Sequence, residues 1–219
     1  MLTALVALLL AAAPSTAPTT RHVDPIVTWL GQLADRDPDV RDAARENLMS
    51  LPPTRLIDLK RAVAAIGAIA PAQALALRDI VTHIYLTGAE YPRDPQGGAF
   101  MGVRMDAQMT DGIVVAMRIP GFDAYRALRD GDVIVAVLES TDPLRTYQDF
   151  SNVIRLRAAG ETVHVKVQRG GRSITVPLRL SPRPADATHA DQMREEQMSD
   201  ADEYWEQNFA KLLEPTASS

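Results

Sequence analysis

The sequence predicts an α+β fold in which helices come first, a β-rich segment follows, and one more helix lies near the C-terminus. Residues 22–90 carry apolar side chains at helical spacing. Residues 99–180 contain short apolar runs separated by glycine-containing turns, as strands do. Residues 181–219 are polar and acidic, apart from a set of apolar side chains close to one helical face near 200–213.

Composition excludes several function classes. The 219-residue chain has no cysteine, so disulfides, thiolate chemistry and cysteine-based zinc sites are excluded. Its net charge is −5, and residues 181–219 carry nearly all of the excess, with 9 acidic and 3 basic side chains. No basic stripe suited to a phosphate backbone is present, so we expect no nucleic-acid partner.

Residues 1–20 have the character of a secretory signal. An apolar run from Leu2 to Ala13 is followed by small residues and prolines, and a bilayer-spanning helix would need about 20 apolar residues. No Lys or Arg precedes the run, and prolines follow the best cleavage positions. We therefore expect export to the periplasm or the cell exterior, with two alternatives: an uncleaved N-terminal anchor or a buried N-terminal helix.

The segment 22–90 is expected to form a small helical bundle. Asp37 is a candidate N-cap, followed by proline at the first helical position, and Val40, Ala44 and Leu48 then share one face. The stretch beginning Asp37-Pro-Asp-Val-Arg resembles one unit of a HEAT repeat. A single such helix pair cannot bury its apolar face alone, so it must pack on other helices or on a neighbouring domain. Residues 91–98, with two prolines and two glycines, are predicted to be a linker.

The β-rich segment shows a regular succession of turns and runs. Pro120-Gly121 predicts a turn, Ala124 to Leu128 a short helix, and Asp130-Gly131-Asp132 a second turn. The run Val133 to Leu138 is apolar on both faces, as in a strand buried between two layers. Gly170-Gly171 is expected to form a hairpin turn, because such turns require a positive φ.

These features resemble those of bacterial-type PDZ domains over residues 99–180. The resemblance implies a PDZ-like, partly open β-barrel or sandwich with two helices. It also implies a carboxylate-binding loop at Phe100-Met101-Gly102-Val103 and a groove helix at 147–158. The chain departs from the family in having Ala127 for the usual glycine, Phe122-Asp123 for Ser-Pro, and a longer turn at 139–143. We expect these departures to lie away from the groove.

The resemblance implies a peptide-binding groove between a strand at 102–105 and the helix at 147–158. An extended peptide would add to the open strand edge, and the loop amides would bind its carboxylate. Core packing is an equal alternative for Phe100, Met105 and Ile154, whereas packing is not expected to require glycine at 102. Arg104 either steers an acidic peptide or is ordinary surface charge. The candidate peptide-binding residues are Phe100, Met101, Gly102, Val103, Arg104, Met105, Phe150, Val153 and Ile154.

Catalytic motifs are missing from the sequence. None of the four histidines has the spacing of a helical zinc site, no Gly-x-Ser-x-Gly elbow occurs, and no phosphate-cradling loop is present. We therefore expect no enzyme activity, no cofactor and no metal.

The sequence thus predicts a non-catalytic adaptor whose PDZ-like groove captures an extended, C-terminal peptide of a protein partner. One alternative is a structural or assembly protein whose groove holds its own tail or a permanent partner. Another is a regulatory fragment of a PDZ-containing protease system. Membrane contact is expected only through an uncleaved N-terminal segment. The apolar side chains of the tail would dock on the protein itself or on a partner: Tyr204, Trp205, Phe209, Leu212 and Leu213.

Overall fold

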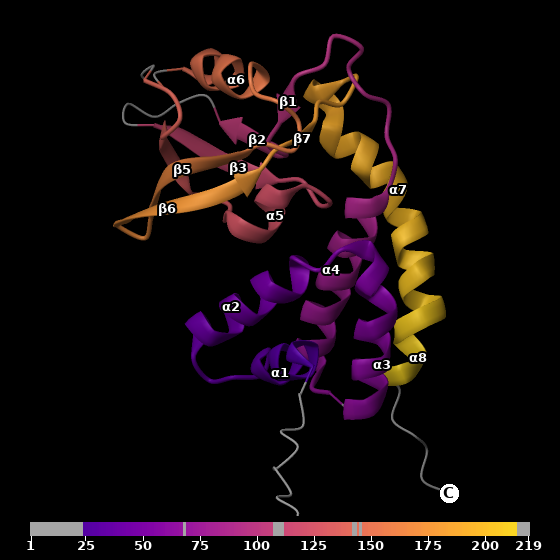
Figure 1. Ribbon diagram of the computed structural model, residues 1–219. Coiled ribbons are helices and arrows are strands. Elements are labelled where there is room, and N and C mark those ends of the chain that lie inside the picture. The colour runs from indigo at the N-terminus through magenta and orange to yellow at the C-terminus, as the bar shows by residue number, and fades with distance from the viewer. Residues whose placement is uncertain (1–23, 68, 107–111, 142–143, 145, 214–219) are drawn as a thin grey trace, which may run out of the picture.

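The computed structural model describes residues 24–67, 69–106, 112–141, 144 and 146–213. Helices that precede the sheet form one body, which we call the helical region. A five-stranded antiparallel sheet with its own helices forms a second, the sheet region, and a long helix that follows the sheet runs along both (Figure 1). This mixture of helices and an antiparallel sheet confirms the predicted α+β class.

The helical region begins with capped helices. Its members are α1 (Pro25–Gln32), α2 (Pro38–Met49), the 3₁₀ turn η1 (Pro53–Arg55), α3 (Leu56–Ile66) and α4 (Pro71–Gly88). At the start of α2, the Asp37 carboxylate accepts a hydrogen bond from the N–H of Asp39 at 2.9 Å, and Pro38 is the first helical residue. The predicted cap is therefore confirmed, and it fixes where the helix begins.

The helix after the sheet completes the core of the helical region. It comprises η2 (Ala187–His189), α7 (Ala190–Trp205), the π-helical turn η3 (Glu206–Ala210) and α8 (Lys211–Leu213). Trp205 and Phe209 are buried, their rings stack at 5.6 Å, and they join the same apolar cluster as residues of α1, α3 and α4. The tail helix thus docks on its own protein, and the HEAT-repeat resemblance stays a prediction.

The sheet has the strand order β2-β3-β4-β5-β6, every neighbouring pair is antiparallel, and it does not close into a barrel. Gly170 and Gly171 have φ of 54° and 78°, which confirms the predicted hairpin turn between the last two strands. The short strands β1 (Ala99–Phe100) and β7 (Ser181–Pro182) pair separately. The five strands are β2 (Val103–Asp106), β3 (Ile113–Arg118), β4 (Val133–Val137), β5 (Thr162–Arg169) and β6 (Arg172–Arg179).

Burial along the strands follows the pleat. In β5, valines 163, 165 and 167 are buried and the residues between them are more exposed. In β4, only Ile134 and Val137 are fully buried, so the expectation that both faces of this strand are covered was wrong. A register shift between Ile134 and Ala136 interrupts the alternation there.

Two helices lie on the sheet region. The first, α5 (Asp123–Ala127), lies beside β6, and the second, α6 (Tyr147–Arg155), lies beside β1. The Thr146 side chain and the Asp149 side chain cap the start of α6 reciprocally, at 3.1 Å and 2.9 Å from the partner amides. This cap sets the rotation with which α6 presents its apolar face to the sheet.

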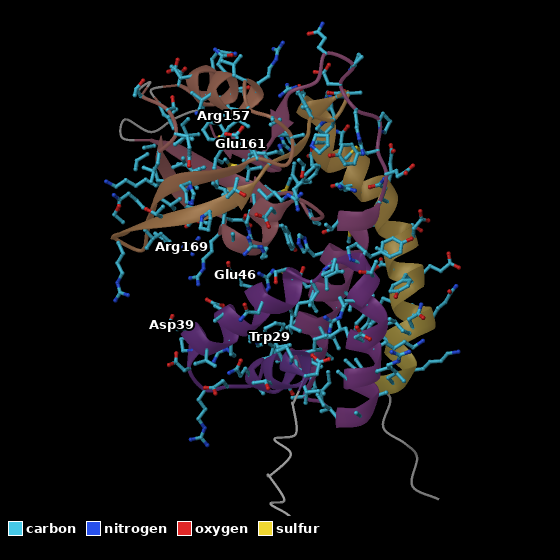
Figure 2. The ribbon with its side chains drawn as sticks, viewed as in Figure 1. Trp29, Asp39, Glu46, Arg157, Glu161 and Arg169 are labelled. Carbon is cyan, nitrogen blue, oxygen red and sulfur yellow. The ribbon has the colours of Figure 1, made fainter. Side chains whose placement is uncertain are left out.

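Close contacts join the two regions. A Cβ on Gly121 would lie 2.8 Å from the side chain of Leu86 and 2.9 Å from its backbone, so this turn packs directly on the end of α4. The Gly121 N–H donates to Nδ1 of the buried His83 at 3.1 Å. Ion pairs surround the contact, among them Arg126 with Glu46 at 2.6 Å; Glu46 lies at the boundary of the regions in Figure 2.

The predicted export signal at residues 1–20 lies outside the described residues. Among the residues described, no helix combines the length and the apolar character that crossing a bilayer requires.

The His83 contact predicts a pH-dependent stability. Burial lowers the pKa of His83 from 6.5 to about 4, and protonation would convert its hydrogen-bond acceptor into a donor facing the Gly121 N–H. Because the unfolded chain binds this proton first, the free energy of unfolding should fall as the pH decreases from about 6.5 to 4. The loss should approach about 3 kcal/mol, and urea unfolding between pH 7 and pH 4 measures it.

The matched control is His83→Asn, whose side-chain oxygen can accept the same bond without titrating. Carboxyl groups titrate in both proteins, so their contributions cancel in the comparison. The variant should show a flatter pH dependence than the native chain, and equal slopes would rule out His83 as the cause.

Candidate peptide-binding site

The loop before β2 and the helix α6 form one apolar wall. Met101 is buried in the same core as Phe150, Val153 and Ile154 of α6, while Val103 and Met105 of β2 pack against that core and remain partly exposed. Six of the nine predicted site residues are therefore brought together, from the loop, the strand and the helix.

Strand β2 is an edge strand. It is at one end of the strand order, and within the described residues only β3 pairs with it. The carbonyl of Gly102 accepts a hydrogen bond from the N–H of Ile119 at 2.9 Å. Because neighbouring residues of an antiparallel strand point their polar groups to opposite sides, the N–H and C=O of Val103 face away from β3. These groups are available to a further strand.

The amide groups of the loop have the properties of an anion site. Gly102 has a φ of 82°, a left-handed conformation that favours glycine. Among the described residues, no backbone carbonyl or side chain accepts the N–H of Met101 or Gly102. Successive amides of this kind can converge on one carboxylate.

Packing also requires the glycine, contrary to the expectation from sequence. A Cβ on Gly102 would lie 2.1 Å from the Cβ of Phe122. Phe122 is one of the departures from the family pattern, and the expectation that these departures lie away from the groove was wrong for this residue. Glycine at position 102 therefore serves the junction with Phe122 as well as the loop.

Phe100 is not part of the apolar wall. Its ring meets that of Phe122 edge-to-face at 5.1 Å, and it belongs to a second cluster with Tyr91, Ile119 and Met193. We call this second cluster the junction cluster; its other members are Phe122 and Ala190. Adjacent residues of an extended chain point to opposite sides, so Met101 lines the wall and Phe100 cannot.

Arg104 connects the edge strand to α7. Its guanidinium lies 2.6 Å from the carboxylate of Asp191, at the start of that helix. The sequence offered only a peptide-steering role or a free surface charge for Arg104, since nothing local indicates a partner 87 positions away. The residues that sequence reasoning missed, Phe122, Tyr91 and Asp191, all act through such long-range contacts.

The described part of the tail, which ends at Leu213, does not fill the groove. Tyr204, Trp205, Phe209, Leu212 and Leu213 all pack on the cluster of the helical region. The alternative in which this apolar segment occupies the groove is therefore wrong.

Comparisons with solved structures return HtrA-type proteases and an HtrA PDZ domain, among others. A variant of the HtrA-type protease AlgW with a decapeptide matches with 22% identity and a TM-score of 0.38, over 52% of this chain and 36% of that one. A serine endoprotease from Yersinia pestis matches with 22% identity and a TM-score of 0.34, over 39% of this chain and 29% of that one. The HtrA3 PDZ domain bound to a phage-derived ligand matches with 21% identity and a TM-score of 0.34, over 39% of this chain and 88% of that one.

The chain thus spans about a third of the length of the HtrA-type proteases that it matches. No protein-family model and no curated protein matches it. The open five-stranded antiparallel sheet with two helices is consistent with a PDZ-like α+β fold.

Two glycines of similar φ, Gly102 and Gly131, allow the stability cost of overpacking to be separated from the cost of the backbone conformation. Gly131 has a φ of 88° with no atom within 4 Å of a Cβ placed on it, whereas Gly102 meets Phe122. Gly131→Ala should cost about 1 kcal/mol of unfolding free energy, from the backbone alone. Gly102→Ala should cost about 3 kcal/mol, because it adds overpacking. Equal losses in urea unfolding would contradict the close contact with Phe122.

Proposed function

We propose that the sheet region binds extended peptides by adding them as a further strand to the outer edge of β2. The observation that carries this proposal is the loop Met101-Gly102-Val103: two of its amides have no acceptor among the described residues, and the third faces the open edge. A peptide ending beside this loop would place its carboxylate at these three donors and its backbone along β2.

The other edge of the sheet is less suited to this role. Strand β6 carries Pro177, which lacks an N–H, and has arginines at both ends. Such features discourage strand addition. Strand β2 has no proline. Its residues Val103 and Met105, together with Ile154 of α6, offer an apolar surface for the last apolar side chain of a peptide.

We infer that the chain is a non-catalytic adaptor. The rings of the described histidines contact no serine or threonine hydroxyl that could serve as a nucleophile: His83 accepts from Gly121, His164 contacts Glu139 at 2.6 Å, and His189 contacts Asp186 at 2.9 Å. Its partners would be proteins with accessible ends, and export to the periplasm or cell exterior would follow from the N-terminal apolar run.

The test is binding of fluorescent peptides with free C-termini, chosen from a random library, and of the same peptides with amidated ends. The native chain should bind the free acids at least tenfold more tightly, because amidation removes the charge that the loop amides hold. Captured peptides should be recovered uncut by mass spectrometry. Absence of capture by any peptide would overturn the proposal, and equal affinity for amidated peptides would exclude the carboxylate loop.

Substitutions at Val103 separate the contribution of its backbone N–H to peptide binding from the contribution of its side chain. Val103→Pro removes the outward N–H without removing a bond to β3. The ratio of the affinity for the free acid to that for the amidated peptide should therefore fall about tenfold. Val103→Ala keeps the N–H, so it should weaken binding while retaining the preference. Thermal unfolding of both variants checks that the fold is intact; a full preference in the folded proline variant would contradict the assigned donor.

A further inference from the structure

A large cleft lies between the helical region and the sheet region, apart from the β2 edge. Its volume is about 1060 Å³, which is just above the upper limit of about 1000 Å³ that is typical of small-molecule sites. The end of α2, the end of α4 and the linker form one side, the turn at Gly121 and the strands β5 to β7 form the other, and Arg194 of α7 also lines it. Three parts of the chain that are distant in sequence therefore build it.

The lining of the cleft is positive, although the chain as a whole has a net charge of −5. Four arginines line it, Arg93, Arg126, Arg179 and Arg194, against the carboxylates of Glu90 and Asp123. Arg126 is neutralised by Asp123 at 2.8 Å and by Glu46.

The other three arginines of the lining have no such compensation. Arg93, Arg179 and Arg194 form no ion pair with a carboxylate in the described part of the chain. Arg93 and Arg179 are exposed, so their side chains can turn towards a bound molecule.

Arg194 is a buried cation without a counter-ion. Its side chain is 2% exposed, and its guanidinium lies over the rings of Phe122 and Tyr91, 4.7 Å and 5.0 Å from their centres. One terminal nitrogen donates to Oε1 of Gln197 at 2.6 Å, and Nε has no acceptor. Burial lowers the pKa of Arg194 to about 10, so it keeps its charge at pH 7. A buried charge that lacks an opposite charge is costly.

The surroundings hold Arg194 in place. The amide nitrogen of Gln197 donates to the carbonyl of Glu90 at 2.8 Å, and this bond orients the Gln197 oxygen towards Arg194. Both aromatic rings, whose centres lie 5.8 Å apart, contact the guanidinium and restrict its movement. Its positive charge is therefore fixed in the wall of the cleft before any ligand arrives.

We propose that this cleft binds a small molecule bearing carboxylate or phosphate groups, with Arg93 and Arg179 contacting it and Arg194 supplying fixed positive charge from the wall. The site is separate from the β2 edge and does not depend on peptide binding there. Arginine suits both anions because its planar donors match paired oxygens.

The experiment is isothermal titration of the full chain with citrate and with inorganic phosphate, each at ionic strength matched with sodium chloride. Saturable binding of either anion, with a rise in the thermal midpoint, is expected. The stronger of the two identifies the preferred group. Binding heats and a shift in the thermal midpoint no greater than those with sodium chloride alone would overturn the proposal.

Three variants locate the site. Arg179→Ala and Arg93→Ala should each weaken anion binding about tenfold while peptide capture is retained, because both side chains are exposed and distant from β2. The matched control is Arg172→Ala, at an exposed arginine of the β5–β6 hairpin outside the cleft, which should bind as the native chain does. Equal losses in the control would show a general charge effect and overturn the assignment.

Arg194→Met tests the fixed charge with little change in volume. It should weaken the anion response about tenfold, because the fixed positive charge is lost, and thermal unfolding of the anion-free variant checks that the fold survives the loss of the contacts with Gln197 and the two rings. An unchanged anion response in this variant would exclude Arg194. If Arg194→Met does not fold, the double variant Arg93→Ala/Arg179→Ala tests the proposal instead. Loss of anion binding in this double variant would support the cleft as the site, and retained binding would overturn the proposal.

Discussion

The packing of Phe122 against Gly102 is the contact on which the arrangement of the molecule depends. Phe122 is buried, and its ring also meets Phe100, Tyr91 and Arg194. Through this one side chain the loop beside β2, the linker and α7 share a common centre. Any residue larger than glycine at position 102 would separate the loop from this centre, so the geometry of the proposed carboxylate site and the joining of the two regions are constrained together.

The structure shows which contacts are made by residues at which the chain departs from the PDZ pattern. Phe122 anchors the junction cluster, and Asp123 accepts the backbone N–H of Arg179 while pairing with Arg126. Glu139, in the lengthened turn, accepts the backbone N–H of His164. A PDZ-like domain that does not pack against other helices has no need for an aromatic anchor such as Phe122. Phe122 is therefore the departure at which the sheet region is adapted to the rest of the chain, whereas Asp123 and Glu139 contact residues of the sheet region itself.

Local patterns in the sequence predicted local structure well. The Asp37 cap and the glycine hairpin depend on neighbours a few residues away, and the structure has both. The grouping of Met101, Val103 and Phe150, which the structure also has, was implied by the resemblance to PDZ domains. The contacts that the sequence did not indicate share one cause. The need for glycine at 102, the aromatic partner of Phe100 and the ion-pair partner of Arg104 depend on Phe122 and Asp191, and no periodicity records contacts across such separations.

Helix α7 makes the helical region discontinuous along the chain. Its core combines residues of α1 to α4 with Trp205 and Phe209, so the sheet region is in effect an insertion between α4 and α7. The two described ends, at α1 and α8, both belong to that helical core and lie on the same side of the molecule in Figure 1. Mechanical tension applied through these ends would first pull α8 and η3 away from α3. The inserted sheet would bear load only after the helical core had come apart.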